Sequence, residues 1–109
     1  MSKKRSKKNL SFTDRLAAAL EKADPGDLAA DAAREGIPAD RFSQAFETAT
    51  TLAQRGPDPR EVAALPATFQ VAFLKLAEAE EDDEQVNDLL SMTSDKNVKK
   101  EAKRVLHRL

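Results

Sequence analysis

Apolar residues recur along most of this chain at every third or fourth position, the spacing that places them on one side of an α-helix. The clearest stretch opens at Pro38 and stops at Gly56. Its apolar stripe consists of Phe42, Ala45, Phe46, Ala49, Leu52 and Ala53. No stretch alternates between apolar and polar residues for long enough to form a strand. The sequence therefore predicts an all-α fold, either a small bundle or a short solenoid.

Helix-capping signals divide the apolar pattern into six or seven helices. Ser11–Asp14 matches a capping box, in which a serine side chain and an acid three residues later satisfy free amides of the first turn. Asp24–Asp27 and Asp58–Glu61 combine a capping aspartate with a proline suited to the first helical position. Glu78–Glu84 interrupts the pattern with acids, and Ser94–Asp95 caps the last helix. We expect one helical domain over residues 11–109, preceded by a disordered tail over residues 1–10.

Large apolar residues are scarce, and this scarcity decides how the phenylalanines are interpreted. Leu, Ile, Val and Phe account for 23 of the 109 residues. The pairs Phe42/Phe46 and Phe69/Phe73 have the i, i+4 spacing of a helix face that either lines a groove or packs in a core. Because so few large side chains are present, we expect the core to need all four. The segment that begins at Pro66 is apolar nearly all round, which indicates the central helix of the domain.

The C-terminal pattern is similar to a known class of helical repeat. It consists of Leu89, Leu90, Asp95, Val98, Lys99, Ala102, Val105, Leu106 and Leu109. It resembles the second half of a HEAT or armadillo-type repeat, which implies a stack of helix pairs that binds other macromolecules, usually without catalysis. Upstream segments do not repeat the pattern at the expected period of about 40 residues, and such arrays generally need about three units. A HEAT-like stack and a generic bundle therefore both stay open.

The composition narrows the class of protein. The chain has no cysteine, which excludes disulfides and cysteine-ligated zinc. It has no apolar run near the roughly 20 residues of a membrane span, and no signal-peptide pattern follows its charged start. We expect a soluble protein without membrane partners in the cytoplasm, or in the nucleus if the cell has one. The spacing of residues does not specify an oligomeric state.

Charge is sorted into three blocks along the chain. Residues 1–10 carry five bases and no acid, a balance of +5. Residues 11–95 carry 18 acids and 7 bases, a balance of −11, and residues 96–109 carry 6 bases and one acid, a balance of +5. The three blocks add up to the net charge of −1. Local electrostatic fields of this kind determine which polyanions a protein attracts. The two basic ends are therefore the segments most suited to bind a polyanion.

The two basic ends are the candidate nucleic-acid contacts. The residues that we expect to contact phosphates are Lys3, Lys4, Arg5, Lys7, Lys8, Lys96, Lys99 and Lys103. The first five form a dense run suited to lying along a phosphate backbone. The last three project outward from the final helix if Val98, Ala102, Val105 and Leu109 face inward. Affinity of this kind comes from counterion release and falls with salt. The alternative is that the tail only keeps the protein soluble.

Enzyme and metal chemistry find little support in the sequence. His107 is the only imidazole, and it stands at the expected end of the last helix, where a solvated histidine is the ordinary interpretation. Phosphate-binding, dinucleotide and zinc-protease motifs are absent. The acidic run Glu78–Glu84 lacks the spacing and the mid-loop glycine of a calcium loop, so we interpret it as a solvated helix end. We expect no catalysis, no metal and no cofactor.

Two functions are therefore compatible with the sequence. The first is a non-catalytic protein whose basic arm contacts RNA, a ribonucleoprotein or DNA, while the helical body presents a surface to a second protein. The second is a protein–protein interaction module, or the N-terminal part of a helical-repeat scaffold, with no nucleic-acid role.

Overall fold

The computed structural model describes residues 11–109, and in this range every regular element is an α-helix. The candidate tail residues Lys3, Lys4, Arg5, Lys7 and Lys8 lie outside the described residues. The helices are α2 (Phe12–Lys22), α3 (Leu28–Arg34), α4 (Ala39–Arg55), α5 (Pro59–Ala63), α6 (Ala67–Ala79), α7 (Asp83–Met92) and α8 (Lys96–Arg108). The all-α prediction is confirmed, with seven helices in the described range.

Helices α2, α5, α7 and α8 begin where the capping residues predict. The start predicted at Asp24 and Pro25 is wrong, because α3 begins only at Leu28 and no side chain caps it. At the start of α2 the Ser11 hydroxyl accepts the Asp14 amide at 3.1 Å, and the Asp14 carboxylate accepts the Ser11 amide at 3.3 Å. Carboxylates of Asp58, Asp82 and Asp95 likewise accept amides in the first turns of α5, α7 and α8. These bonds satisfy donors that a helix end otherwise leaves without a partner.

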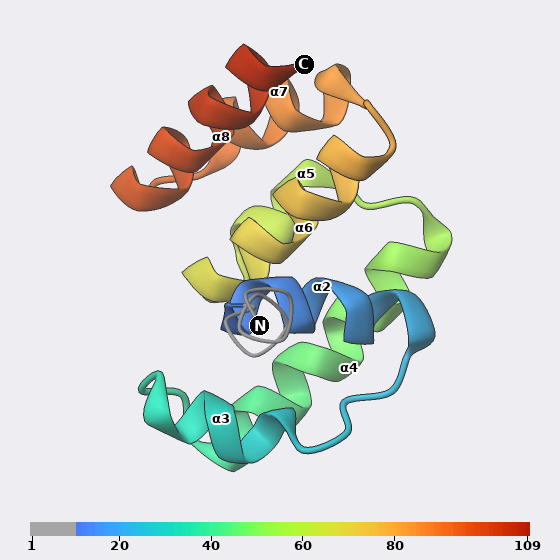
Figure 1. Ribbon diagram of the computed structural model, residues 1–109, viewed down its shortest axis with the longest axis vertical. Coiled ribbons are helices and arrows are strands. Elements are labelled where there is room, and N and C mark those ends of the chain that lie inside the picture. Colours follow the sequence, from blue (N-terminus) through green and yellow to red (C-terminus); the bar gives the residue numbers. More distant parts are fainter. Residues whose placement is uncertain (1–10) are drawn as a thin grey trace, which may run out of the picture.

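Helix α6 is the centre of the domain. It packs against α2, α4, α5, α7 and α8, so that α3 is the one other described helix that it does not touch. Figure 1 shows α6 in the middle of the molecule, with α2 crossing it, α3 and α4 on one side, and α7 and α8 on the other. The prediction that this segment is buried holds along its length, since six of its residues are buried, including Phe69, Phe73 and Leu74.

The phenylalanines meet at the contact between α2, α4 and α6. The Phe42 ring lies 5.7 Å from that of Phe46 and 5.6 Å from that of Phe69, measured between ring centroids. Phe12 adds a third ring 6.4 Å from Phe42. All five phenylalanines of the chain, Phe73 included, are buried. The four predicted core rings are confirmed as core, and Phe42 and Phe46 also border a surface depression beside Ala23 and Thr50.

A buried polar network ties the turn before α8 to the turn before α6. The Gln70 amide nitrogen donates to the carbonyls of Ala63 and Leu65 at 3.2 and 2.8 Å. The Thr93 hydroxyl donates to the Gln70 amide oxygen at 2.6 Å and accepts the Asp95 amide at 3.2 Å. Gln70 and Thr93 are the buried polar residues of the described range. Because every polar atom finds a partner, the network fixes the start of α8 without an uncompensated buried group.

The described helices do not show a HEAT or armadillo repeat. Helices α7 and α8 pack against each other, as the resemblance implies, and Asp95 stands at the turn between them. Both also pack on α6, in a bundle rather than a stack of equivalent pairs. One detail of the prediction is wrong: Leu109 does not face inward but is 45% exposed, because α8 ends at Arg108.

None of the helices in residues 11–109 combines the length and the apolar character that crossing a membrane would require.

Candidate nucleic-acid interface

Helix α8 has one fully buried side and one charged side. Val98, Ala102 and Val105 are 0% exposed, and they face the helices α6 and α7 on which α8 packs. Lys96, Lys99 and Lys103 are exposed, as the sequence predicts. The buried side holds the helix in place, so the lysines project from a rigid support.

The centre of the exposed face is a residue that the predicted site omits. A helix turns about 100° per residue, which offsets Lys100 by about 160° from both Val98 and Ala102. Lys99 is offset by only about 100° from Val98 and about 60° from Ala102, on the flank of the helix. Lys100 is exposed, and it lies in one row with Lys96, Lys103 and His107. Plotting the helix around its apolar residues would have found it.

We call Lys96, Lys99, Lys100 and Lys103 the lysine face. Within residues 11–109 none of these four side chains forms an ion pair. Glu101, the only acid of α8, is committed to the two arginines of the helix instead. The lysine face therefore carries four positive charges that the described part of the protein leaves uncompensated.

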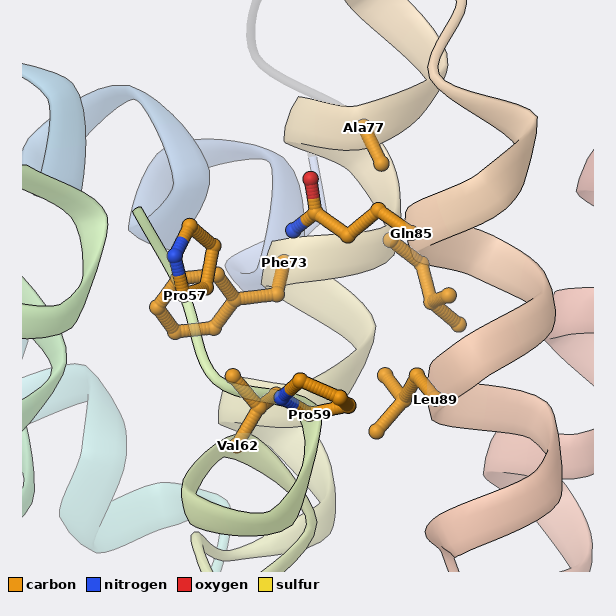
Figure 2. A pocket seen from close by; sticks show the side chains of 8 residues that line it. Pro57, Pro59, Val62, Phe73, Ala77, Gln85 and Leu89 are labelled. Atoms are coloured by element: carbon orange, nitrogen blue, oxygen red, sulfur yellow. The ribbon is translucent and has the colours of Figure 1, made fainter. Parts of the chain in front are cut away.

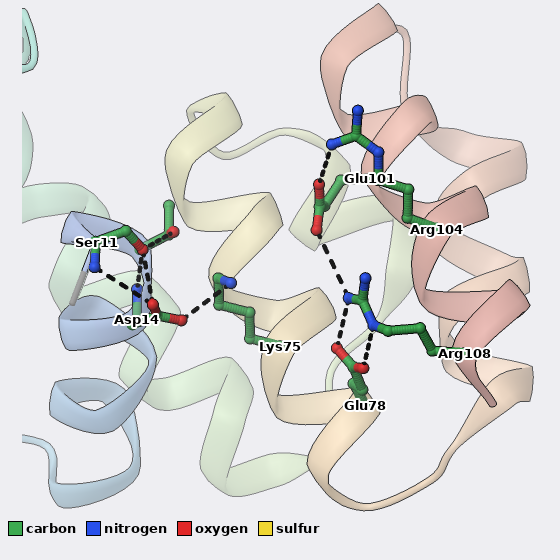
Figure 3. A network of polar contacts seen from close by, with 8 residues as sticks. Ser11, Asp14, Lys75, Glu78, Glu101, Arg104 and Arg108 are labelled. Carbon is green, nitrogen blue, oxygen red and sulfur yellow. Dashed lines mark hydrogen bonds and ion pairs between the residues drawn. The ribbon is translucent and has the colours of Figure 1, made fainter. Parts of the chain in front are cut away.

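The arginines of α8 are bound to carboxylates of the protein itself (Figure 3). Arg108 makes a two-pronged contact with Glu78 of α6, with nitrogen–oxygen distances of 2.6 and 2.9 Å. The Nη2 atom of Arg108 also lies 3.8 Å from a carboxylate oxygen of Glu101. Arg104 contacts the other oxygen of Glu101 at 3.3 Å. Paired forks of this kind are the strongest geometry that arginine and carboxylate offer. Arg108 thus attaches α8 to α6, Arg104 is paired within α8, and the lysines stay open to solvent.

These contacts shift the ionisation of the groups involved. Hydrogen bonding from Arg108 is the largest cause that lowers the pKa of the Glu78 carboxyl, and burial opposes it. The same bond raises the pKa of the Arg108 guanidinium. On α2, hydrogen bonding from Lys75 lowers the pKa of Asp14 in the same way. Each shift favours the charged form, so the pairs stay ionised at neutral pH.

The start of the described chain is linked to α8 by a line of charges. Lys75 of α6 contacts Asp14 at 3.0 Å, and one turn further along α6 Glu78 holds Arg108. Figure 3 shows these side chains in sequence from Ser11 across α6 to α8. The point at which residues 1–10 join the described domain is thus on the side of α6 where the α8 arginines attach.

Cavities in the described structure do not suggest a substrate site. An enclosed apolar cavity between α5, α6 and α7 has a volume of about 10 Å³, which accommodates at most about one water molecule. Figure 2 shows Pro57, Pro59 and Gln85 closing it over Phe73. The larger hollows are open surface depressions, for example one bordered by Arg41, Ala45 and Leu65.

The acidic run gathers no metal site. Within residues 11–109 no group of three or more histidine or acidic side chains is arranged to hold a metal ion. Asp82 caps α7, and Asp83 and Glu84 lie in its first turn, where negative charge favours the helix dipole. His107 is exposed in the last turn of α8.

Comparisons of the chain with protein-family models, with curated proteins and with solved structures found no match.

Proposed function

We propose that this protein binds nucleic acid, as RNA, ribonucleoprotein or DNA, without catalysing a reaction. The lysine face of α8 contacts phosphates on a rigid support, and the basic run over Lys3 to Lys8 adds further contacts. The observation that carries the proposal is the division of charge on α8. Its arginines are paired inside the protein, and its four lysines are exposed and unpaired within the described residues.

Four uncompensated lysines on one short helix are electrostatically unfavourable unless a polyanion neutralises them. Lys96 and Lys100 are four residues apart, and so are Lys99 and Lys103, and like charges at this spacing repel each other. A phosphate backbone relieves that repulsion and releases its own condensed counterions on binding. Binding of nucleic acid to the helix is therefore favoured both by the relief of lysine repulsion and by the release of counterions.

The acidic body directs contact to the basic ends. Residues 11–95 carry a balance of −11, which repels phosphates over the remaining surface. We therefore expect a small footprint centred on α8, with moderate affinity at low salt.

The test is fluorescence anisotropy of labelled duplexes and single strands of RNA and DNA, titrated with protein from about 50 to about 200 mM salt. One variant combines Lys96→Gln, Lys100→Gln and Lys103→Gln. Its matched control combines Lys22→Gln, Arg41→Gln and Arg60→Gln, three exposed bases elsewhere that form no ion pair in the described structure. Both variants lose three positive charges, so only the position differs.

We expect the α8 variant to bind at least roughly tenfold more weakly at low salt, with a slope of log K against log salt reduced by about three. The control should bind as the native protein does. A tail variant with Gln at positions 3, 4, 5, 7 and 8 measures how much the basic run over residues 1–10 contributes to binding. Equal weakening in the α8 variant and the control would mean that only total charge matters. Absence of binding by the native chain would overturn the proposal and favour a protein partner.

A further inference from the structure

We infer that the nucleic acid is double-stranded and is contacted along its phosphates, without its bases being read. This inference rests on the proposed function and specifies the ligand of the same lysine face. It follows from the side chains that the surface of the described domain exposes around the lysine face.

The domain over residues 11–109 exposes no aromatic ring on which an unpaired base can stack. Single-strand binding proteins combine a basic groove with exposed aromatic rings, and the rings supply much of the affinity. This chain contains no tryptophan or tyrosine, and all five of its phenylalanines are buried in the core. A single strand would therefore meet the lysines alone and gain nothing from its exposed bases.

One of the two guanidinium forks of α8 is occupied by another helix, and the other has a single contact within α8. Arginine reads guanine through its two-pronged fork, whereas lysine contacts phosphate as a single charge. The Arg108 fork is taken by Glu78, and Arg104 contacts Glu101. The row itself consists of Lys96, Lys100, Lys103 and His107, and an exposed amide and an exposed guanidinium of α8, those of Asn97 and Arg104, stand beside it. Phosphate contacts fix position and orientation but carry no sequence information.

The lysine row is rigid and straight, which matches the backbone of a duplex. Lys96 and Lys103 are separated by about 10 Å along the helix axis at about 1.5 Å per residue. Each strand of a DNA duplex presents about one phosphate per 3.4 Å of the axis, so such a row spans about three phosphates that are already in place. A single strand must first be ordered along the row, and ordering costs affinity.

The positive surface is also too narrow to guide a flexible strand. Helix α7 packs beside α8 and carries exposed acids at Asp83, Glu84 and Asp88. On α6 and α8 themselves, Glu78 and Glu101 lie where the arginines attach. A strand that wraps around the domain would meet these acids, whereas a straight duplex touches α8 alone among the described helices.

The test is anisotropy with the native full chain at about 50 mM salt. The probes are a 20-base-pair DNA duplex, an RNA duplex of the same sequence, their separate single strands, and a DNA duplex of unrelated sequence. We expect duplexes to bind roughly tenfold more tightly than single strands of equal length, because only they present an ordered phosphate row. The two DNA sequences should agree within about twofold.

An Arg104→Lys variant, which keeps the charge but removes the fork, should bind the duplexes with unchanged affinity. Single strands that bind as tightly as duplexes would overturn the inference while the proposed function stands. So would a tenfold preference between the two DNA sequences, or a tenfold loss in Arg104→Lys. Absence of binding to every probe would instead remove the proposed function, and this inference with it.

Discussion

Helices α6 and α8 have the same length, 13 residues, and opposite uses. Helix α6 is apolar on most sides, packs against five other helices and contains a single base, Lys75, which is paired with Asp14. Helix α8 buries one stripe of three residues and exposes a row of lysines. One helix holds the core together, and the other packs one side on that core and exposes a charged surface on its opposite side.

Packing and pairing account for a larger share of the residues in α6 than in α8. In α6 nearly every residue is explained by packing, capping or pairing. In α8 packing explains Val98, Ala102 and Val105, and pairing explains the two arginines. Neither packing nor pairing involves the four exposed lysines, and the proposed function assigns them a role.

The largest expected effect on the free energy of unfolding comes from a substitution in the buried side of α6. Phe73→Ala removes a buried ring from the centre of the domain, and such substitutions cost about 3–5 kcal/mol of unfolding free energy. A domain of this size has roughly 5–15 kcal/mol in total, so the variant should be close to unfolding. Urea unfolding followed by far-UV circular dichroism measures the loss, with the partly exposed Leu76→Ala as a smaller reference. A loss below 1 kcal/mol would show that α6 is not the centre.

A smaller loss is expected at the junction between the two helices. Thr93→Val keeps the shape of the side chain but leaves the Gln70 amide oxygen and the Asp95 amide without their hydroxyl partner. A buried polar group without a partner costs about 1–3 kcal/mol. The control is Thr51→Val, whose exposed hydroxyl donates to the Glu47 carbonyl and should matter little. Equal losses in the two variants would contradict a role for burial.

Much of the fold could be predicted because its signals are local. The capping box at Ser11, the aspartates before α5, α7 and α8, and the apolar spacing of α4 each involve residues within a few positions of one another. Burial of the phenylalanines also followed from the scarcity of large side chains. For the candidate interface, the exposure of Lys96, Lys99 and Lys103 needed only the apolar stripe of α8 as a reference.

The remaining features depend on contacts between distant parts of the sequence. Gln70 and Thr93 are 23 residues apart, and Glu78 and Arg108 are 30 residues apart. Nothing in their local sequence distinguishes them from other polar residues. The separation of paired arginines from unpaired lysines on α8 therefore became visible only when α6 and α8 were placed side by side.

The ion pair at the start of α2 gives an effect that depends on pH. Lys75 lowers the pKa of Asp14 in the folded protein, so the stability that Asp14 contributes is fully present above its ordinary value of 3.8. It is lost as pH falls through the lower folded pKa. Asp14→Asn should therefore cost about 0.5–1 kcal/mol at pH 7, since both groups are partly exposed. The cost should therefore shrink as pH falls below 3.8.

Urea unfolding at pH 7, 5 and 2.5 measures this dependence. Glu21→Gln, an exposed and unpaired acid of the same helix in the described structure, is the control and should show little cost at any pH. A cost in Asp14→Asn that persists unchanged at pH 2.5 would mean that the neutral capping geometry, and not the charge of Asp14, provides the stability.

The smallest effect on stability is expected from the combined Lys96→Gln, Lys100→Gln and Lys103→Gln variant. Surface substitutions usually change stability by less than about 0.5 kcal/mol, and here two terms favour the variant. It removes like-charge repulsion, worth about 0.2–0.5 kcal/mol per pair, and it removes a cation at Lys96 from the positive end of the α8 dipole. The melting temperature should therefore stay the same or rise by a few degrees.

Thermal unfolding at low salt, where these repulsions are least screened, is the sharpest comparison. An unchanged or raised melting temperature together with lost nucleic-acid binding would assign the lysines to the interface, because a misfolded variant would lose both. A raised melting temperature would also show that these residues lower stability in the free protein, as expected where a surface serves binding. A loss above 1 kcal/mol would instead mean that α8 needs its lysines to fold, and the contrast with α6 would no longer point to a ligand.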